Sequence, residues 1–153
     1  MAFCEFLNKD NIWIDTTAKS KSGALLNMSK LLGQCHPELD AQLLFNAYWE
    51  RERLGSTTLG HGTMIPHVRL QSIEKTYGCF MKLQKPIDFE AEDKQPVDLI
   101  FGLVVPFQDG KAHLATLSKI VKQFSDPYFR IECRQRLDQD SLCAFLIQSF
   151  HSL

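Results

Sequence analysis

The sequence predicts an α/β protein with a mixed parallel and antiparallel β-sheet flanked by helices on both faces. Two neighbouring stretches, 75–89 and 97–106, are rich in β-branched and aromatic residues, while helical apolar periodicity precedes and follows them. At 153 residues the chain is long enough for one hydrophobic core. Because no linker, repeat or charge block divides it, we expect a single domain over 1–153.

The N-terminal part predicts a first helix in 19–33, "KSKSGALLNMSKLLG". Ser20 or Ser22 is a candidate N-cap and Gly33 a candidate stop. Its predicted buried face consists of Leu25, Met28 and Leu32.

A second helix is predicted in 37–55, where Pro37 suits a first helical turn. Arg51 and Arg53 close it favourably before Gly55, because cations stabilise a helix C-terminus. Its apolar repeat consists of Leu39, Leu43, Ala47 and Leu54.

Two strands are predicted next, in 75–89 and 97–106, with a polar turn at 90–96 between them. The stretch 97–106, "VDLIFGLVVP", is apolar on both faces, which predicts a central, doubly covered strand.

A helix is predicted from His113, and two more within 125–137 and 139–150, with Asp126 and Asp140 as cap candidates. The apolar stripe of the first consists of Leu114, Leu117, Ile120, Val121 and Phe124.

Composition excludes several classes of function. With 17 basic and 18 acidic side chains, no strong field favours nucleic acid or an acidic membrane surface. The longest apolar run, 99–107, is far shorter than the roughly 20 residues of a membrane span, and the start lacks signal-peptide features. Five scattered cysteines without C-x-x-C argue against disulfides and structural zinc. We therefore expect a cytoplasmic protein without metal or cofactor.

The segment 51–70, "RERLGSTTLGHGTMIPHVRL", holds the main site candidates. His67 follows Ile65-Pro66, which indicates a fixed backbone just past a short strand. Phosphate-binding groups are expected among the nearby hydroxyl and glycine residues, while His61 is a further candidate for lining the site. By itself, this pattern is also typical of an ordinary turn with a surface histidine. The expected phosphate-binding residues are Ser56, Thr57, Gly60 and Gly62.

Arg51 and His113 are candidates from outside that loop. Arg51 offers a bidentate clamp for phosphate, and His113 lies near a helix start, where the dipole favours an anion. A solvated arginine and a histidine that ends a loop remain open alternatives, and His36 is interpreted as structural. G-x-S-x-G and Walker motifs are absent, but a neutral imidazole can attack phosphorus itself.

Three motifs occur in order along the chain: R-E-x-x-x-S-T from Arg51, G-x-G-x-x-I-P-H from Gly60, and P-V-D-L-x-F-x-L-x-V-P from Pro96. Together they resemble the type-2 enzyme IIA domains of the bacterial phosphoenolpyruvate-dependent phosphotransferase system, the fructose/mannitol group. The resemblance extends from about Lys19 to the C-terminal helix and is strongest to the nitrogen-related branch.

This resemblance implies a mixed sheet with flanking helices and a phosphoryl group accepted on His67 from a small histidine phosphocarrier protein. It also implies that Arg51 and His113 complete the active site. Thr63, Met64 and Val68 stand where the family commonly has small residues, which bears on the choice of partner. A partner that docks at this loop is expected to use apolar contacts such as Met64 and Val68.

Three functions remain open at this stage. A regulatory phosphocarrier that binds its target proteins mainly when unphosphorylated is preferred. A sugar-specific enzyme IIA that passes phosphate to a IIB domain is the second, and a binding module without phosphotransfer is the third.

Overall fold

The computed structural model describes residues 3–108 and 110–151. In it, β6 (Val97–Pro106) runs through the middle of a mixed sheet. β6 pairs antiparallel with β5 (Tyr77–Ile87) and parallel with both β3 (Thr63–Met64) and β4 (His67–Leu70). All of β6 is buried except for half-buried Asp98, which confirms the prediction of a central strand covered on both faces.

The described residues contribute six strands to this sheet. β1 (Ile12–Thr16) lies parallel to β5 at one edge, and β2 (Thr58–Gly60) lies antiparallel to β3 at the other. The predicted α/β class with a mixed sheet is confirmed. The predicted domain limits, 1–153, include residues outside the described ranges, namely 1, 2, 109, 152 and 153.

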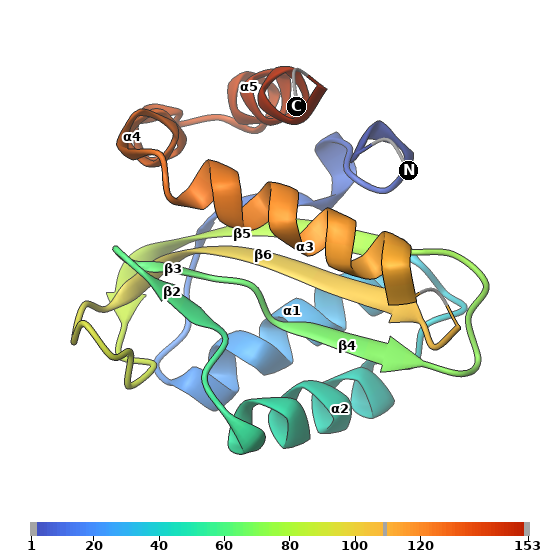
Figure 1. The fold of residues 1–153 in the computed structure, drawn as a ribbon. Coiled ribbons are helices and arrows are strands. Elements are labelled where there is room, and N and C mark those ends of the chain that lie inside the picture. The colour runs from blue at the N-terminus through green and yellow to red at the C-terminus, as the bar shows by residue number, and fades with distance from the viewer. Residues whose placement is uncertain (1–2, 109, 152–153) are drawn as a thin grey trace.

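Helices cover the sheet in two layers (Figure 1). α1 (Lys21–Cys35) and α2 (Ala41–Leu54) lie on one face. α3 (Gly110–Phe124), α4 (Pro127–Gln135) and α5 (Gln139–His151) lie on the other, which confirms helices on both faces. Two 3₁₀ turns, Phe3–Glu5 and Lys9–Asn11, precede β1.

The alternation of side chains along the strands divides the core into two halves. Cys79 and Met81 of β5 pack with the α1–α2 layer, whereas Phe80 between them packs with α3, α4 and α5. Tyr48 of α2 is fully buried, and its hydroxyl donates to the carbonyl of Leu103 at 2.8 Å. This bond fixes α2 against β6.

The limits of α1 agree with the prediction at one end only. Ser20 is its N-cap, because its hydroxyl accepts from the N–H of Gly23. The helix continues to Cys35, so the predicted stop at Gly33 is wrong. A Cβ at position 33 would lie 3.3 Å from the Cβ of Ala41, and glycine therefore allows α1 and α2 to approach closely.

The start of α2 also differs from the prediction. The helix begins at Ala41 because Asp40 caps it, accepting from the N–H groups of Gln42 and Leu43, so the start at Pro37 is wrong.

The C-terminal helices give a mixed result for the predicted caps. Asp126 caps α4 as predicted. At α5, the carboxylate of Asp138 accepts from the N–H of Ser141, while the predicted cap, Asp140, lies within the first turn.

The predicted apolar stripes of two helices agree only in part with the buried faces, since Ile120 and Phe124 of α3 are buried as expected. In α2, Leu43 is 47% exposed and Leu54 86% exposed, and in α3, Leu114 is 64% exposed. The buried faces include polar side chains, Glu52 in α2 and His113 and Thr116 in α3, so apolar periodicity alone does not identify the face that packs on the sheet. The buried residues are Leu44, Tyr48 and Glu52 in α2 and His113, Thr116, Ile120 and Phe124 in α3.

Candidate functional site

The backbone before His67 fixes the orientation of its imidazole. Pro66 joins β3 to β4, and its carbonyl accepts from the N–H of Leu103 in β6 at 2.9 Å. Nδ1 of His67 lies 2.8 Å from the carbonyl oxygen of Ile65. Because a carbonyl only accepts, Nδ1 carries the proton and donates it, and the neutral ring keeps its lone pair on Nε2.

His67 lines a cavity of about 500 Å³ between α2, β4 and α3. Arg51 of α2 and His113 of α3 line the same cavity, so the structure brings these three predicted site residues together. The remaining lining residues are Ala47, Glu50, Leu54, Val68, Arg69, Leu114 and Leu117.

The surroundings of His67 favour its neutral form. Burial lowers the pKa of His67 below its ordinary value, and the positive charge of Arg51 lowers it further. The hydrogen bond to Ile65 and the negative charge of Glu52 oppose this shift without reversing it. A neutral imidazole at neutral pH is the nucleophilic form.

Arg51 and His113 lie on opposite helices of the cavity. Among the described residues, the guanidinium of Arg51 makes one hydrogen bond, from Nη1 to the carbonyl of Gly55 at 2.9 Å. Four of about five N–H donors thus remain for a ligand. His113 is 7% exposed, and its ring lies 5.5 Å from that of His67, centroid to centroid.

The predicted hydroxyl ligands lie outside this cavity. Thr57 is buried, and its hydroxyl donates to Oε2 of Glu52 at 2.8 Å. Ser56 is exposed and shares a hydrogen bond of 2.6 Å with the hydroxyl of Thr58. Glu52 is a further residue of the site that was not predicted, although its place in R-E-x-x-x-S-T, beside Arg51, is a signal in the sequence.

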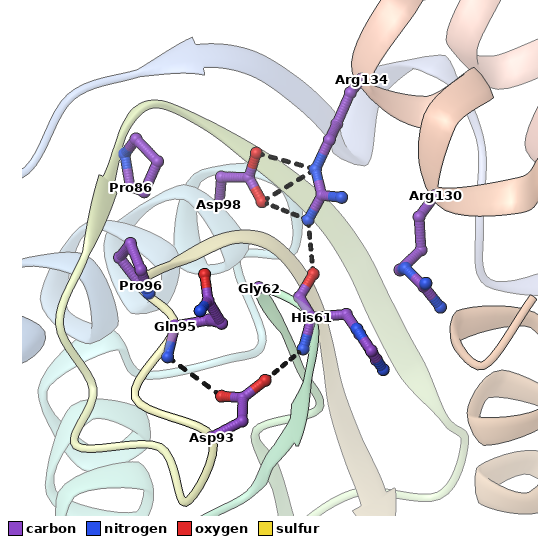
Figure 2. A pocket seen from close by; sticks show the side chains of 9 residues that line it. All are labelled: His61, Gly62, Pro86, Asp93, Gln95, Pro96, Asp98, Arg130 and Arg134. Atoms are coloured by element: carbon purple, nitrogen blue, oxygen red, sulfur yellow. Dashed lines mark hydrogen bonds and ion pairs between the residues drawn. The ribbon is translucent and has the colours of Figure 1, made fainter. Parts of the chain in front are cut away.

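The glycine-rich turn lines a second cavity, of about 560 Å³ (Figure 2). His61 and Gly62 line it, and Gly60, His61 and Gly62 have consecutive positive φ angles of 86°, 56° and 77°. Its charged lining residues are Asp93, Asp98, Arg130 and Arg134. The structure therefore places the predicted Gly60, His61 and Gly62 apart from the His67 cavity.

Hydrogen bonds hold this turn from two sides, as Figure 2 shows. Asp93 accepts from the N–H of His61 at 2.8 Å. Arg134 donates to the carbonyl of His61 at 2.6 Å and pairs with both carboxylate oxygens of Asp98. The charged groups that line the second cavity, those of Asp93, Asp98, Arg130 and Arg134, are thus already hydrogen-bonded.

Of the two expected docking contacts, Met64 is corrected by its burial, whereas Val68 lines the His67 cavity. Met64 and Thr63 are fully buried, and Val68 is 7% exposed. Most of the exposed apolar surface beside His67 comes from Leu54 and Leu114, the two exposed leucines of the cavity.

The described parts of the chain contain no group of three or more His, Cys, Asp or Glu residues that could hold a metal ion. Within the same residues, no helix is both long enough and apolar enough to cross a membrane.

Comparison with known proteins establishes the class to which this fold and cavity belong. Residues 5–149 match the family described as "Phosphoenolpyruvate-dependent sugar phosphotransferase system, EIIA 2". The chain belongs to this family, as its motifs indicated.

Within the family, the chain is a homologue of nitrogen regulatory proteins. It is 40% identical over 121 residues to the nitrogen regulatory protein of Escherichia coli (strain K12), covering 78% of this chain and 74% of that one. The crystal structure of nitrogen regulatory protein IIA-Ntr from Neisseria meningitidis matches with a TM-score of 0.88 at 32% identity, covering 94% and 98% of the two chains. IIA mannitol from Escherichia coli shares the fold, with a TM-score of 0.76 at 18% identity over 91% and 97%.

Proposed function

We propose that this protein is a phosphoryl carrier in which Nε2 of His67 accepts a phosphoryl group from the phosphohistidine of a small histidine phosphocarrier protein. The observation that carries this proposal is the hydrogen bond from Nδ1 to Ile65, in a ring that shares its cavity with Arg51 and His113. This bond makes Nε2 the nucleophilic nitrogen. Membership of the family supports the choice of donor.

The transfer needs no other reactant. The Nε2 lone pair attacks phosphorus, the N–P bond to His67 forms, and the P–N bond to the carrier's imidazole breaks with its electron pair remaining on the carrier. Nδ1 keeps its proton and its bond to Ile65, so the phosphorylated ring of His67 forms as an imidazolium. The carrier's ring leaves as neutral imidazole, because its other nitrogen is protonated before the transfer.

Arg51 and His113 position and stabilise the group in transit. Phosphoryl transfer depends mainly on positioning and on neutralising charge. The available guanidinium donors of Arg51 suit the phosphoryl oxygens, and the ring of His113 flanks His67.

The output of the carrier is regulatory in this proposal. The relatives at 40% identity are named nitrogen regulatory proteins, which supports this role. Leu54 and Leu114 form an apolar rim beside His67 on which a target protein can dock. A phosphoryl group adds roughly −1.5 to −2 charges at the centre of that contact, by analogy with other phosphorylated side chains. Target proteins therefore bind the unphosphorylated form and are released by phosphorylation.

A phosphorylation assay tests the carrier function. Purified protein is incubated with phosphoenolpyruvate, enzyme I and the carrier, and acid-labile phosphate is mapped. His67→Ala should accept none, whereas His61→Ala, a histidine of the second cavity, should match the wild type. Label that persists in His67→Ala contradicts the assignment, and a wild type that takes no phosphate favours the binding-module alternative.

A pull-down from cell lysate tests the output. The baits are unphosphorylated protein, phosphorylated protein and His67→Ala, together with Leu114→Ser and its control Leu137→Ser, an exposed leucine between α4 and α5. Target proteins should be lost on phosphorylation and in Leu114→Ser. Identical partner sets from all baits would contradict the switch and favour phosphate transfer to a IIB domain.

A further inference from the structure

Glu52 is a buried carboxylate close to the active site. It lies in the last turn of α2 and is 7% exposed. Oε1 accepts from the N–H of Thr57 at 3.2 Å, and Oε2 accepts from the hydroxyl of Thr57 at 2.8 Å. A buried carboxylate is costly unless it is hydrogen-bonded, so these two bonds make the position of residue 57 relative to α2 specific.

The other bonds of the loop between α2 and β2 are local. The N–H of Gly55 donates to the carbonyl of Glu52 at 3.3 Å, and the hydroxyl of Ser56 accepts from the N–H of Thr58 at 3.1 Å. Gly55 and Ser56 are exposed, and a Cβ added at Gly55 would have no neighbour within 4 Å. Packing therefore does not determine where the carbonyl of Gly55 lies. That carbonyl accepts the hydrogen bond of Arg51, so the loop sets the direction of the guanidinium.

The same loop is bonded to the segment that presents His67. The carbonyl of Thr57 accepts from the N–H of Ile65 at 3.0 Å, and the carbonyl of Ile65 accepts from Nδ1 of His67 at 2.8 Å. Thr57 is thus one hydrogen-bonded step from Ile65, and two residues from the carbonyl that holds Arg51.

We propose that Glu52 and Thr57 form a positioning pair that holds the 55–57 loop and thereby places the Arg51 guanidinium against His67. This inference rests on the proposed function for its kinetic consequence. Thr57, expected from the sequence to bind phosphate, acts in this proposal through Arg51 and does not touch the phosphoryl group.

Thr57→Val is the main test, because it removes the hydroxyl donor while nearly conserving volume. We expect phosphate acceptance from the carrier to slow about tenfold, since small displacements of a positioned group are costly. Thr57→Ser, which keeps the donor, should stay within about twofold of the wild type. Thr57→Ala places no methyl group against the carboxylate and should slow phosphate acceptance to the same extent. It tests the inference if Thr57→Val does not fold.

A double-mutant cycle with Arg51→Ala separates positioning from a general structural role. If Thr57 acts through Arg51, the loss caused by Thr57→Val should shrink to about twofold or less when Arg51 is already absent. An equal loss in both backgrounds, or a valine variant that transfers at the wild-type rate, overturns the inference.

A titration of His67 by NMR tests the placement without phosphoryl transfer. Arg51 lowers the pKa of His67, so a displaced guanidinium should raise it. Thr57→Val should therefore raise the pKa of His67, and Thr57→Ser should not. If the wild type accepts no phosphate while this titration responds as expected, the proposed function fails and the positioning pair stands. An unchanged pKa in Thr57→Val, or an equal rise in Thr57→Ser, overturns the pair.

Discussion

The two cavities of this protein have similar components and different chemistry. Each is lined by a histidine from the segment 51–70 and by an arginine from a helix: His67 with Arg51, and His61 with Arg134. In the second cavity, Arg134 is paired with both carboxylate oxygens of Asp98 and with the carbonyl of His61. In the first, Arg51 has a single carbonyl partner among the described residues.

The two arginines differ in the charge and the donors that their partners leave available. A carboxylate neutralises the guanidinium and consumes its donors, so Arg134 fastens α4 to β6 and to the glycine-rich turn. Asp93 and Asp98 would also repel a phosphoryl group there. Arg51 keeps its charge and most of its donors for a ligand, which is what a phosphoryl site requires.

Substitutions of the two arginines should give the largest difference in phosphorylation rate between the cavities. Arg51→Ala should slow phosphate acceptance about 100-fold, because it removes donors aimed at a charged transition state. Arg51→Lys keeps the charge but loses the planar fork, and should slow it about tenfold. The measurement is the rate of phosphorylation by the carrier. Arg134→Lys is the matched control, and an equal loss in that variant would end the distinction between the cavities.

His113→Ala should have the next largest effect. A hydrogen bond to a charged group contributes about 1.5–3 kcal/mol, and we expect the loss of this neighbour to slow acceptance by about tenfold. Single-turnover kinetics, with His61→Ala as the control, measure this step. A wild-type rate in His113→Ala would remove His113 from the mechanism.

A substitution in the second cavity should lower the stability of the fold. Asp98→Asn weakens the charge pair with Arg134. The side chain of Asp98 is 19% exposed and that of Arg134 is 35% exposed, so we expect a loss of about 1 kcal/mol in the free energy of unfolding. Denaturant unfolding measures this value, with Asp140→Asn as an exposed control. A clear drop in the phosphorylation rate of folded Asp98→Asn would contradict a purely structural role for the second cavity.

Much of the difference between the two cavities could not be predicted from the sequence. Local patterns were enough to predict β6, the Ser20 and Asp126 caps and the candidate histidines, because they depend on neighbouring residues. The sequence did not separate Gly60 and Gly62 from His67, because β3 lies between them and the second cavity is completed by Arg134 of α4 and Asp93 of the β5–β6 loop, which lie far away in the sequence. Nor could it indicate that Leu54 and Leu114 face outward, because the buried faces of their helices carry polar side chains, Glu52 in α2 and His113 and Thr116 in α3.

The smallest expected effect is a change in the pKa of His67, and it compares the two arginines without any kinetics. Burial lowers this pKa first and the charge of Arg51 lowers it further, while Ile65 and Glu52 act in the opposite direction. Removing the charge while keeping the stem, as in Arg51→Met, should therefore raise the pKa of His67. Arg134→Met should leave it unchanged, because Arg134 is neutralised by Asp98 in the other cavity.

The sign of the pH dependence follows from this shift. The folded protein binds a proton at His67 less readily than the unfolded chain, so His67 contributes stability above its ordinary pKa that is lost as pH falls through the lowered one. Phosphate acceptance should fall over the same range, because the protonated ring has no lone pair on Nε2. In Arg51→Met the decline should begin at a higher pH than in the wild type. NMR titration of the His67 ring and a pH–rate profile measure the two effects. If Arg51→Met and Arg134→Met titrate alike at His67, Arg51 does not act on that imidazole as the geometry indicates.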